Sequence, residues 1–212
     1  MHVLVMAKAP EPGRVKTRLC PPCDPVEAAA LAEASLADTC EAVAGCGAER
    51  RVVALDGRPG DWLPPGFEVI AQRGRSLGER LANAWVDTGG PGVQIGMDTP
   101  QVTSAVLDQA LGLLCPPSTA ALFGPAFDGG WWAIGLPRPD PRVFIGVPMS
   151  MPHTGAAQHR RLRALGHRVV ELPILRDVDR IEDAVAVSQI APGTRFAAAL
   201  RLSTEERAAR SA

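Results

Sequence analysis

The chain has 212 residues and a formal net charge of −1, and 21% of its residues are charged. This length supports one generous hydrophobic core and is short for two ordinary domains, so we predict a single domain over residues 1–202, followed by a frayed tail at 203–212. The balanced charge excludes an overall basic field that would attract nucleic acid or an anionic membrane, so any phosphate binding has to be local.

The first residues read as a buried strand, and no apolar run approaches the roughly 20 residues of a membrane span. We therefore expect a cytoplasmic protein with neither membrane nor nucleic-acid partners. The cysteines number five and are irregularly spaced, which does not describe a disulfide framework, so reduced thiols are expected. Cys20-Pro-Pro-Cys23 has redox spacing but lacks thioredoxin-like surroundings, and we interpret it as a turn.

A short apolar strand at 3–6 opens the chain and leads into a loop rich in proline and glycine. A helix is predicted from Pro25 to Gly45, capped by Asp24 and Glu27, and a second helix follows Ser76, with Leu77 on its buried face. The other predicted strands are 51–55, 67–71, 93–96, 120–124, 131–136 and 168–172, and the other helices are 102–114, 154–165 and 181–190.

Strands that alternate with helices of ten or more residues predict an α/β fold with a mainly parallel sheet covered on both faces. Ligands of such sheets bind at the C-terminal ends of the strands. The candidate binding residues are therefore those that directly follow a predicted strand.

The loop after the first strand carries four cations within eleven residues, namely Lys8, Arg14, Lys16 and Arg18. Guanidinium groups match phosphate oxygens bidentately, an ammonium adds a point charge, and Gly13 lets backbone N–H groups approach a ligand. The loop matches neither the Walker A nor the GxGxxG pattern, and a solvated basic loop is the simpler alternative. Because prolines and a glycine restrict the loop that carries these cations, directly after a buried strand, we favour a phosphate site.

Asp98 ends another apolar strand and is followed by Thr99-Pro100. Mg²⁺ prefers one or two carboxylates together with phosphate oxygens, and Asp98 fits that role. The alternative is an aspartate that caps the next helix, and spacing alone does not separate the two readings.

Asp128-Gly129-Gly130 precedes the pair Trp131-Trp132. Asp128 could hold a ribose or sugar hydroxyl, and the glycines permit close backbone approach, although the motif is also an ordinary hairpin turn. Because strand side chains alternate, one tryptophan should face the pocket side and the other a helix layer.

A cluster of acids precedes the helix at 181–190. Asp179 followed by Glu182 forms a capping box, which is a sufficient structural explanation for one of them. Capping does not explain Asp177.

Together these segments resemble a bacterial family of GT-A-like transferases, known as CofC-like or selenodomain-associated glycosyltransferases. The resemblance runs from Met1 to about Val187, and it is carried by AKAPEPGRVKTRL, GMDTPQVT, GPAFDGGWWAIGL, GVPMSMPHTG and LRDVDRIEDA. It implies a single-domain, three-layer nucleotide-diphospho-sugar transferase fold with a mainly parallel mixed sheet. It also implies a nucleotide over the first strands and a divalent metal, Mg²⁺ or Mn²⁺, near the central aspartate.

The resemblance also assigns individual residues. The metal ligands that it implies are Asp98 and Asp179, the latter matching the late acid that completes the metal site in related nucleotidyltransferases. Phe127 stands where many relatives have an acid, and Met149-Ser150 where many have Trp-Ser, so the acceptor stays open. The residues implied to bind the nucleotide are Lys8, Gly13, Arg14, Lys16, Arg18, Gly129 and Gly130.

Two activities share this machinery, with Lys16, Asp98 and Asp128 as the expected catalytic residues. In a glycosyltransferase, Mg²⁺ and the basic loop stabilise the departing nucleoside diphosphate, and Asp128 orients the donor sugar or a small-molecule acceptor. In a nucleotidyltransferase, the loop holds a triphosphate, and a sugar phosphate or phospho-acid attacks it with release of pyrophosphate.

The cation-rich loop favours nucleotidyl transfer, whereas the resemblance along the whole chain favours glycosyl transfer, which we take as the prediction. A non-catalytic nucleotide-binding protein is the third alternative. The base, the sugar and the oligomeric state stay open.

Overall fold

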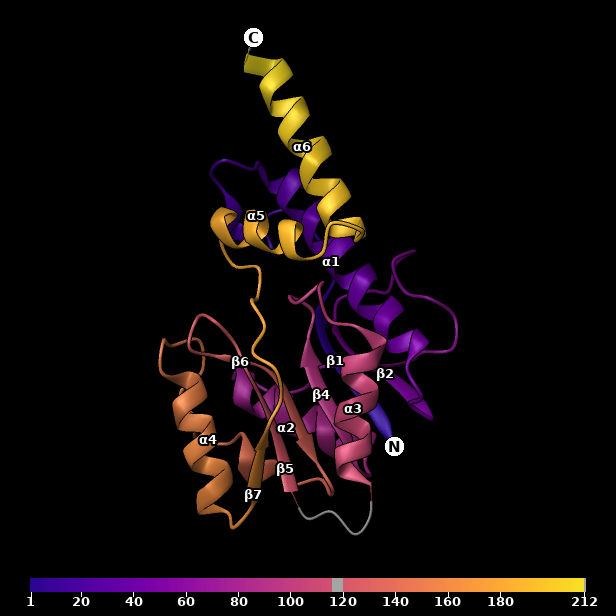
Figure 1. The fold of residues 1–212 in the computed structure, drawn as a ribbon, viewed down its shortest axis with the longest axis vertical. Coiled ribbons are helices and arrows are strands. Elements are labelled where there is room, and N and C mark those ends of the chain that lie inside the picture. Colours follow the sequence, from indigo (N-terminus) through magenta and orange to yellow (C-terminus); the bar gives the residue numbers. More distant parts are fainter. Residues whose placement is uncertain (116–119, 212) are drawn as a thin grey trace.

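The computed structural model describes residues 1–115 and 120–211 and shows one sheet with helices packed around it (Figure 1). The elements in chain order are β1 (His2–Lys8), η1 (Thr17–Leu19), α1 (Pro25–Gly45), β2 (Arg50–Asp56), β3 (Glu68–Ala71), α2 (Leu77–Thr88), β4 (Gly92–Gly96), α3 (Ser104–Leu114), β5 (Ala120–Pro125), β6 (Trp131–Leu136), η2 (Pro141–Val143), α4 (Thr154–Ala164), β7 (Arg168–Glu171), α5 (Ile181–Ile190) and α6 (Arg195–Ser211).

The sheet has seven strands in the order β3-β2-β1-β4-β6-β5-β7. Strand β6 runs antiparallel to both of its neighbours, and every other neighbouring pair is parallel. Val5 of β1 pairs with Val53 of β2 and Ile95 of β4, so the centre of the sheet is apolar. The predicted α/β fold with a mainly parallel mixed sheet is confirmed, and the C-terminal ends of β1 to β4 share one edge.

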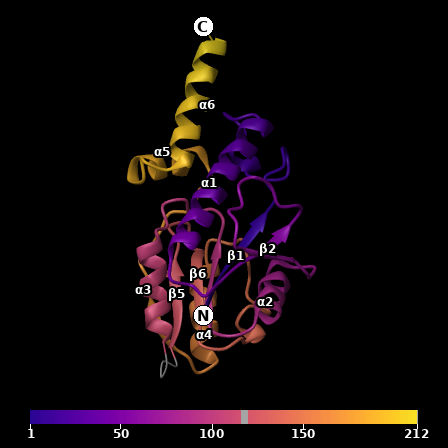
Figure 2. The same cartoon turned by 90° about the vertical axis from the view of Figure 1, so that its right-hand side faces the viewer.

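Helices cover both faces of the sheet, as predicted. Helices α1 and α3 bury one face through residues such as Leu36 and Leu107, and α2 and α4 bury the other through Trp85 and Leu162. Figure 2 shows α3 and α2 on opposite sides of the strands. The apolar layers on the two faces of the sheet therefore fix the position of the edge at which the strands end.

Two of the three predicted capping boxes are confirmed. Asp24 accepts hydrogen bonds from the backbone N–H groups of Val26 and Glu27, and Ser76 accepts one from Glu79. Leu77 was predicted to be buried but is 45% exposed, because it is the first residue of α2 and borders a cavity.

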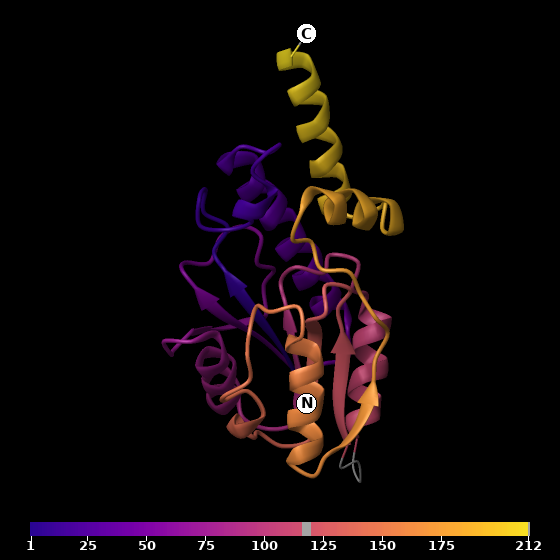
Figure 3. The ribbon, with the colours of Figure 1, turned by 90° about the vertical axis from the view of Figure 1, so that its left-hand side faces the viewer.

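Helix α6 continues through residues 203–211, which were predicted to fray. Its start is capped by Asp38, whose carboxylate accepts the backbone N–H groups of Arg195 and Phe196 at 3.0 and 2.8 Å. Near its end, Arg207 and Arg210 both pair with Glu27 of α1. These tertiary contacts join α6 to α1, and the helix extends away from the sheet, shown in yellow in Figure 3. Fraying of the tail stays a prediction.

The cap of α5 differs from the predicted one by one residue. The helix begins at Ile181, and the Asp183 carboxylate accepts the backbone N–H groups of Asp179 and Arg180 at 3.3 and 2.9 Å. Asp179 is therefore not the capping residue, and its carboxylate is available to other partners. None of the described helices is long and apolar enough to cross a membrane.

Candidate functional site

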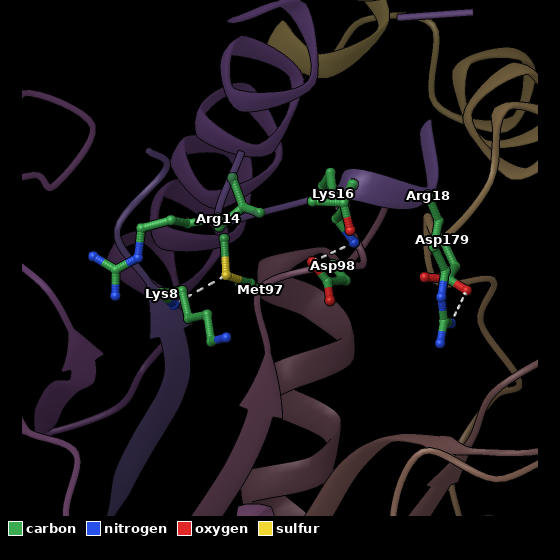
Figure 4. A pocket seen from close by; sticks show the side chains of 9 residues that line it. Lys8, Arg14, Lys16, Arg18, Met97, Asp98 and Asp179 are labelled. Atoms are coloured by element: carbon green, nitrogen blue, oxygen red, sulfur yellow. Dashed lines mark hydrogen bonds and ion pairs between the residues drawn. The ribbon is translucent and has the colours of Figure 1, made fainter. Parts of the chain in front are cut away.

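A small pocket of about 220 Å³ lies where β1 and β4 end. Its lining residues come from the basic loop, from the residues after β4 and from the segment before α5. They are Lys8, Arg14, Val15, Lys16, Thr17, Arg18, Met97, Asp98 and Asp179 (Figure 4). The structure therefore brings the four predicted cations and both predicted metal acids to one place.

Lys16 reaches directly to Asp98. Its ammonium lies 2.6 Å from the Asp98 carboxylate and also donates a hydrogen bond to the carbonyl oxygen of Val178. The lysine side chain is only 9% exposed, whereas that of Asp98 is 42% exposed. Desolvation of the ammonium strengthens this pair relative to one at the surface.

The backbone of Lys16 is left-handed, with φ 49° and ψ 33°. Among the described residues other than glycine, only Lys16 and Ser150 have positive φ. Ser150 lines a neighbouring cavity, so both exceptional conformations border the site. Such conformations cost roughly 1–3 kcal/mol each and persist where surrounding structure enforces them.

Arg18 forms the second cross-segment pair. Its guanidinium lies 2.6 Å from the carboxylate of Asp179, which comes from the segment before α5 (Figure 4). This hydrogen bond to Asp179 raises the pKa of Arg18. The short helix η1 places Lys16 and Arg18 so that one segment contacts both acids.

Lys8 and Arg14 border the same pocket without contacting those acids. The backbone N–H of Lys8 donates to the Met97 sulfur at 3.2 Å, and its ammonium points into the open space beside it (Figure 4). Arg14 pairs with Glu11 at 2.7 Å and approaches Asp56 at 3.9 Å.

Gly13 directly precedes Arg14 with φ +75°, and a Cβ atom there would meet no heavy atom within 4 Å. The backbone conformation therefore explains why this residue is a glycine, because only glycine adopts positive φ without steric cost. Its predicted contact with a ligand stays a prediction.

A larger cavity of about 760 Å³ adjoins the small pocket and shares five of its residues. The shared residues are Lys8, Arg18, Met97, Asp98 and Asp179. Cationic and carboxylate side chains therefore lie on the boundary between the small basic pocket and the larger cavity, which we call the chamber.

Asp177 also lines the large cavity, and it was not among the predicted site residues. Burial raises its pKa to about 6, and the nearby charges of Asp128 and Asp98 add to this effect, with Lys16 opposing them. Three carboxylates thus influence one another electrostatically in one chamber. The signal available in the sequence was that the predicted capping box gave a role to Asp179 and Glu182 and none to Asp177.

Asp128 lies in the turn between β5 and β6 and faces the large cavity. Its carboxylate accepts the backbone N–H of Gly130 at 2.7 Å, which is the hairpin-turn arrangement considered from the sequence. Gly129 has φ +87°, and a Cβ there would lie 2.0 Å from the Pro152 carbonyl oxygen. That glycine therefore permits the packing of the 149–152 segment, and its binding role stays a prediction.

Part of the lining of the large cavity is apolar. Four of the five methionines of the chain line the cavity, namely Met6, Met97, Met149 and Met151. Trp131 joins them, whereas the neighbouring Trp132 is buried and donates its indole N–H to the Pro173 carbonyl oxygen at 2.9 Å. The predicted division of the two tryptophans between pocket and core is confirmed.

The carboxylates at the site suit a divalent cation whose coordination shell is completed by oxygen atoms of a bound ligand. Within residues 1–115 and 120–211, no group of three or more His, Cys, Asp or Glu side chains is arranged to hold a metal ion. Asp98 and Asp179 offer two carboxylates, and Mg²⁺ needs no more protein ligands when phosphate oxygens and water complete its shell. Burial is the main cause of the raised pKa of Asp177, and the neighbouring carboxylates of Asp128 and Asp98 add to it.

The sheet order and the basic pocket at the ends of β1 and β4 place the molecule in the nucleotide-diphospho-sugar transferase and cytidylyltransferase class of folds. The chain belongs to a bacterial family whose model matches residues 28–151 and is described as "Uncharacterized protein conserved in bacteria (DUF2064)". No protein with a curated function matches the sequence.

Solved structures resemble almost the whole chain. A "putative nucleotide-diphospho-sugar transferase" from Desulfovibrio desulfuricans G20 has a TM-score of 0.84 and 28% identity, covering 96% of this chain and 95% of that one. A cytidylyltransferase from Leptospira borgpetersenii has a TM-score of 0.53 and 14% identity, with 98% and 94% covered. Glucosyl-3-phosphoglycerate synthase from Mycobacterium tuberculosis, solved with Mn²⁺ and UDP, has a TM-score of 0.50 and 12% identity, with 89% and 75% covered.

Proposed function

We propose that the protein is a transferase dependent on Mg²⁺ or Mn²⁺ that acts at the diphosphate of a nucleotide sugar and moves the sugar to a small acceptor. The observation that carries this proposal is the two-part cavity, in which a small basic pocket meets a larger chamber at Asp98 and Asp179. A diphosphate in the small pocket would place the attached sugar in the chamber, with room for a second reactant.

Each residue then has a chemical role. Lys8, Arg14 and Lys16 bind the phosphate oxygens, and Asp98 and Asp179 hold the divalent cation. The cation, when bound, supplies positive charge that stabilises the departing nucleoside diphosphate. The basic loop adds to that stabilisation, because fixed cations in a partly desolvated pocket need little reorganisation during the reaction.

Asp128 would orient a hydroxyl group of the donor sugar or the acceptor, since its carboxylate borders the chamber. The apolar wall around Trp131, Met149 and Met151 suits an acceptor with an apolar face, because thioethers and an indole adapt to such surfaces. The name of the Desulfovibrio desulfuricans protein supports this proposal, as does the resemblance to CofC-like and selenodomain-associated glycosyltransferases.

Nucleotidyl transfer is the second candidate, and a specific observation favours it. Four cations lie between residues 8 and 18, which is a large positive charge for a diphosphate alone and would suit a triphosphate. A sugar phosphate or phospho-acid would then attack the α-phosphorus, and pyrophosphate would leave. A nucleotide-binding protein without turnover is the third candidate, and the retention of Asp98 and all loop cations opposes it.

Product analysis separates these candidates. The protein is incubated with Mg²⁺ and a panel of nucleotide sugars, then with nucleoside triphosphates and sugar phosphates, and the products are identified by mass spectrometry. We expect release of a nucleoside diphosphate from a nucleotide sugar. Pyrophosphate release from a triphosphate would replace glycosyl transfer by nucleotidyl transfer. Absence of any thermal stabilisation by nucleotides with Mg²⁺ would contradict both enzymatic proposals.

A further inference from the structure

The two acids proposed to hold the metal are each already paired with a cation from the same short segment. Lys16 lies 2.6 Å from Asp98, and Arg18 lies 2.6 Å from Asp179. The two cations are separated by one residue, at the start of η1. Any divalent ion that binds both carboxylates has to compete with both side chains.

The ammonium of Lys16 stands between the two segments that carry these acids. It contacts the Asp98 carboxylate after β4 and the carbonyl oxygen of Val178, the residue directly before Asp179. Asp98 and Asp179 would hold the divalent cation, and both carboxylates line the small pocket in which Lys16 lies. The ammonium is therefore placed as an internal counter-ion at the proposed metal position.

Lys16 is suited to leave this position. Its left-handed backbone is unfavourable for a residue with a side chain, so the surrounding contacts have to maintain it. Its flexible four-carbon stem also lets the ammonium change partners without movement of the strands.

We propose that Lys16 and Arg18 are counter-ions that exchange partners when a divalent cation and a nucleotide diphosphate bind together. This proposal rests on the proposed function. In the exchange, the carboxylates of Asp98 and Asp179 pass from the two side chains to the divalent cation, and the two side chains pass to the diphosphate oxygens. After the exchange, the two carboxylates face the divalent cation and the two basic side chains face the diphosphate. No charge in the site is therefore left unpaired.

Two consequences follow from the exchange. The divalent cation alone binds weakly, because it has to displace both side chains without offering them new anions. A nucleoside diphosphate strengthens cation binding, and by thermodynamic reciprocity the cation strengthens nucleotide binding by the same factor.

The test measures Mn²⁺ binding without nucleotide, by electron paramagnetic resonance, in the wild type, Lys16→Met and Lys8→Met. Lys8→Met is the matched control, because the chain has only two lysines, and both line the small pocket. We expect Lys16→Met to bind Mn²⁺ about fivefold or more tightly than the wild type, within the usual range of coupling between sites. We expect Lys8→Met to stay within about twofold of the wild type, because its contribution is long-range and screened by salt.

Unchanged or weaker Mn²⁺ binding by a folded Lys16→Met protein would overturn the exchange. An equal gain in Lys8→Met would also overturn it, because general charge removal would then explain the effect. Circular dichroism checks the fold of each variant. Arg18→Met is a second variant at a more exposed position, and it should also bind Mn²⁺ more tightly.

A second arm repeats the titrations with ADP, CDP, GDP and UDP. A nucleoside diphosphate should raise the Mn²⁺ affinity of the wild type by a larger factor than that of Lys16→Met. An equal factor in both proteins would overturn the exchange and leave the proposed function intact. If no nucleoside diphosphate changes Mn²⁺ affinity in either protein, the exchange and the proposed function both fail, even where the order of affinities without nucleotide is as expected.

Discussion

The guanidinium of Arg18 lies 2.6 Å from the Asp179 carboxylate, although 161 positions separate the two residues along the chain. Together with the Lys16–Asp98 pair, this contact joins the loop after β1, the end of β4 and the segment before α5. Three segments far apart in sequence thus meet at one sheet edge, where the small pocket opens into the large chamber.

Substitution of Asp98 tests the proposed metal ligand. Asp98→Asn keeps the shape of the side chain and removes its charge, so metal-dependent turnover should fall by about 10²–10³-fold. Its stability cost should be about 1 kcal/mol, because Lys16 keeps its hydrogen bond to Val178 and Asp98 is 42% exposed. Steady-state kinetics and urea unfolding measure the two effects.

Asp87→Asn is the matched control, because Asp87 pairs with Arg73 at 2.5 Å and neither residue lines the small pocket or the large cavity. Turnover of that variant should equal that of the wild type. Retained turnover in Asp98→Asn would remove Asp98 from the mechanism.

The cysteine pair in the turn before α1 should be dispensable. Cys23 is buried, and burial raises the pKa of its thiol, which disfavours the reactive thiolate. We expect the double variant Cys20→Ser and Cys23→Ser to keep its kcat and to lose about 1 kcal/mol of unfolding free energy. A tenfold or greater loss of kcat, measured alongside the wild type, would assign this turn a role in the reaction.

His2 gives the stability of the protein a specific pH dependence. The ring is 1% exposed, and burial, assisted by Arg50 and the N-terminal amine, lowers its pKa to about 4. Between pH 6.5 and 4 the unfolded chain binds a proton at this residue that the folded chain does not. Stability therefore falls as the pH drops through this window, by at most about 3 kcal/mol from His2.

The variant His2→Gln isolates this effect, since glutamine does not titrate. Urea unfolding at pH 7.5 and pH 4.5 should show a smaller loss of stability for His2→Gln than for the wild type. Parallel losses in the two proteins would show that His2 is not the residue that titrates in this window.

Local patterns in the sequence predicted the elements and the edge that carries the site. Capping boxes at Asp24 and Ser76 depend on residues within one helical turn, so they are visible without tertiary information. The fold class followed from alternating strands and helices, and the strand ends then located the cations of the loop and Asp98.

Properties that depend on distant packing could not be predicted. The raised pKa of Asp177 requires burial and the charges of Asp128 and Asp98, which come from other strand ends. The pairing of Lys16 with Asp98 likewise depends on how the loop folds back over β4. The ion pair between Arg207 of α6 and Glu27 of α1 also joins distant segments, and no pattern near residue 207 indicates it.

In the proposed site, a nucleotide diphosphate and a divalent cation meet at Asp98, beside the basic loop. A crystal structure with Mn²⁺ and a nucleoside diphosphate, in which anomalous scattering locates the metal, tests this arrangement. We expect a Mn²⁺ peak about 2 Å from an Asp98 carboxylate oxygen, with phosphate oxygens against Lys8 and Lys16. A metal and diphosphate bound elsewhere, with Lys16 still paired to Asp98, would contradict it.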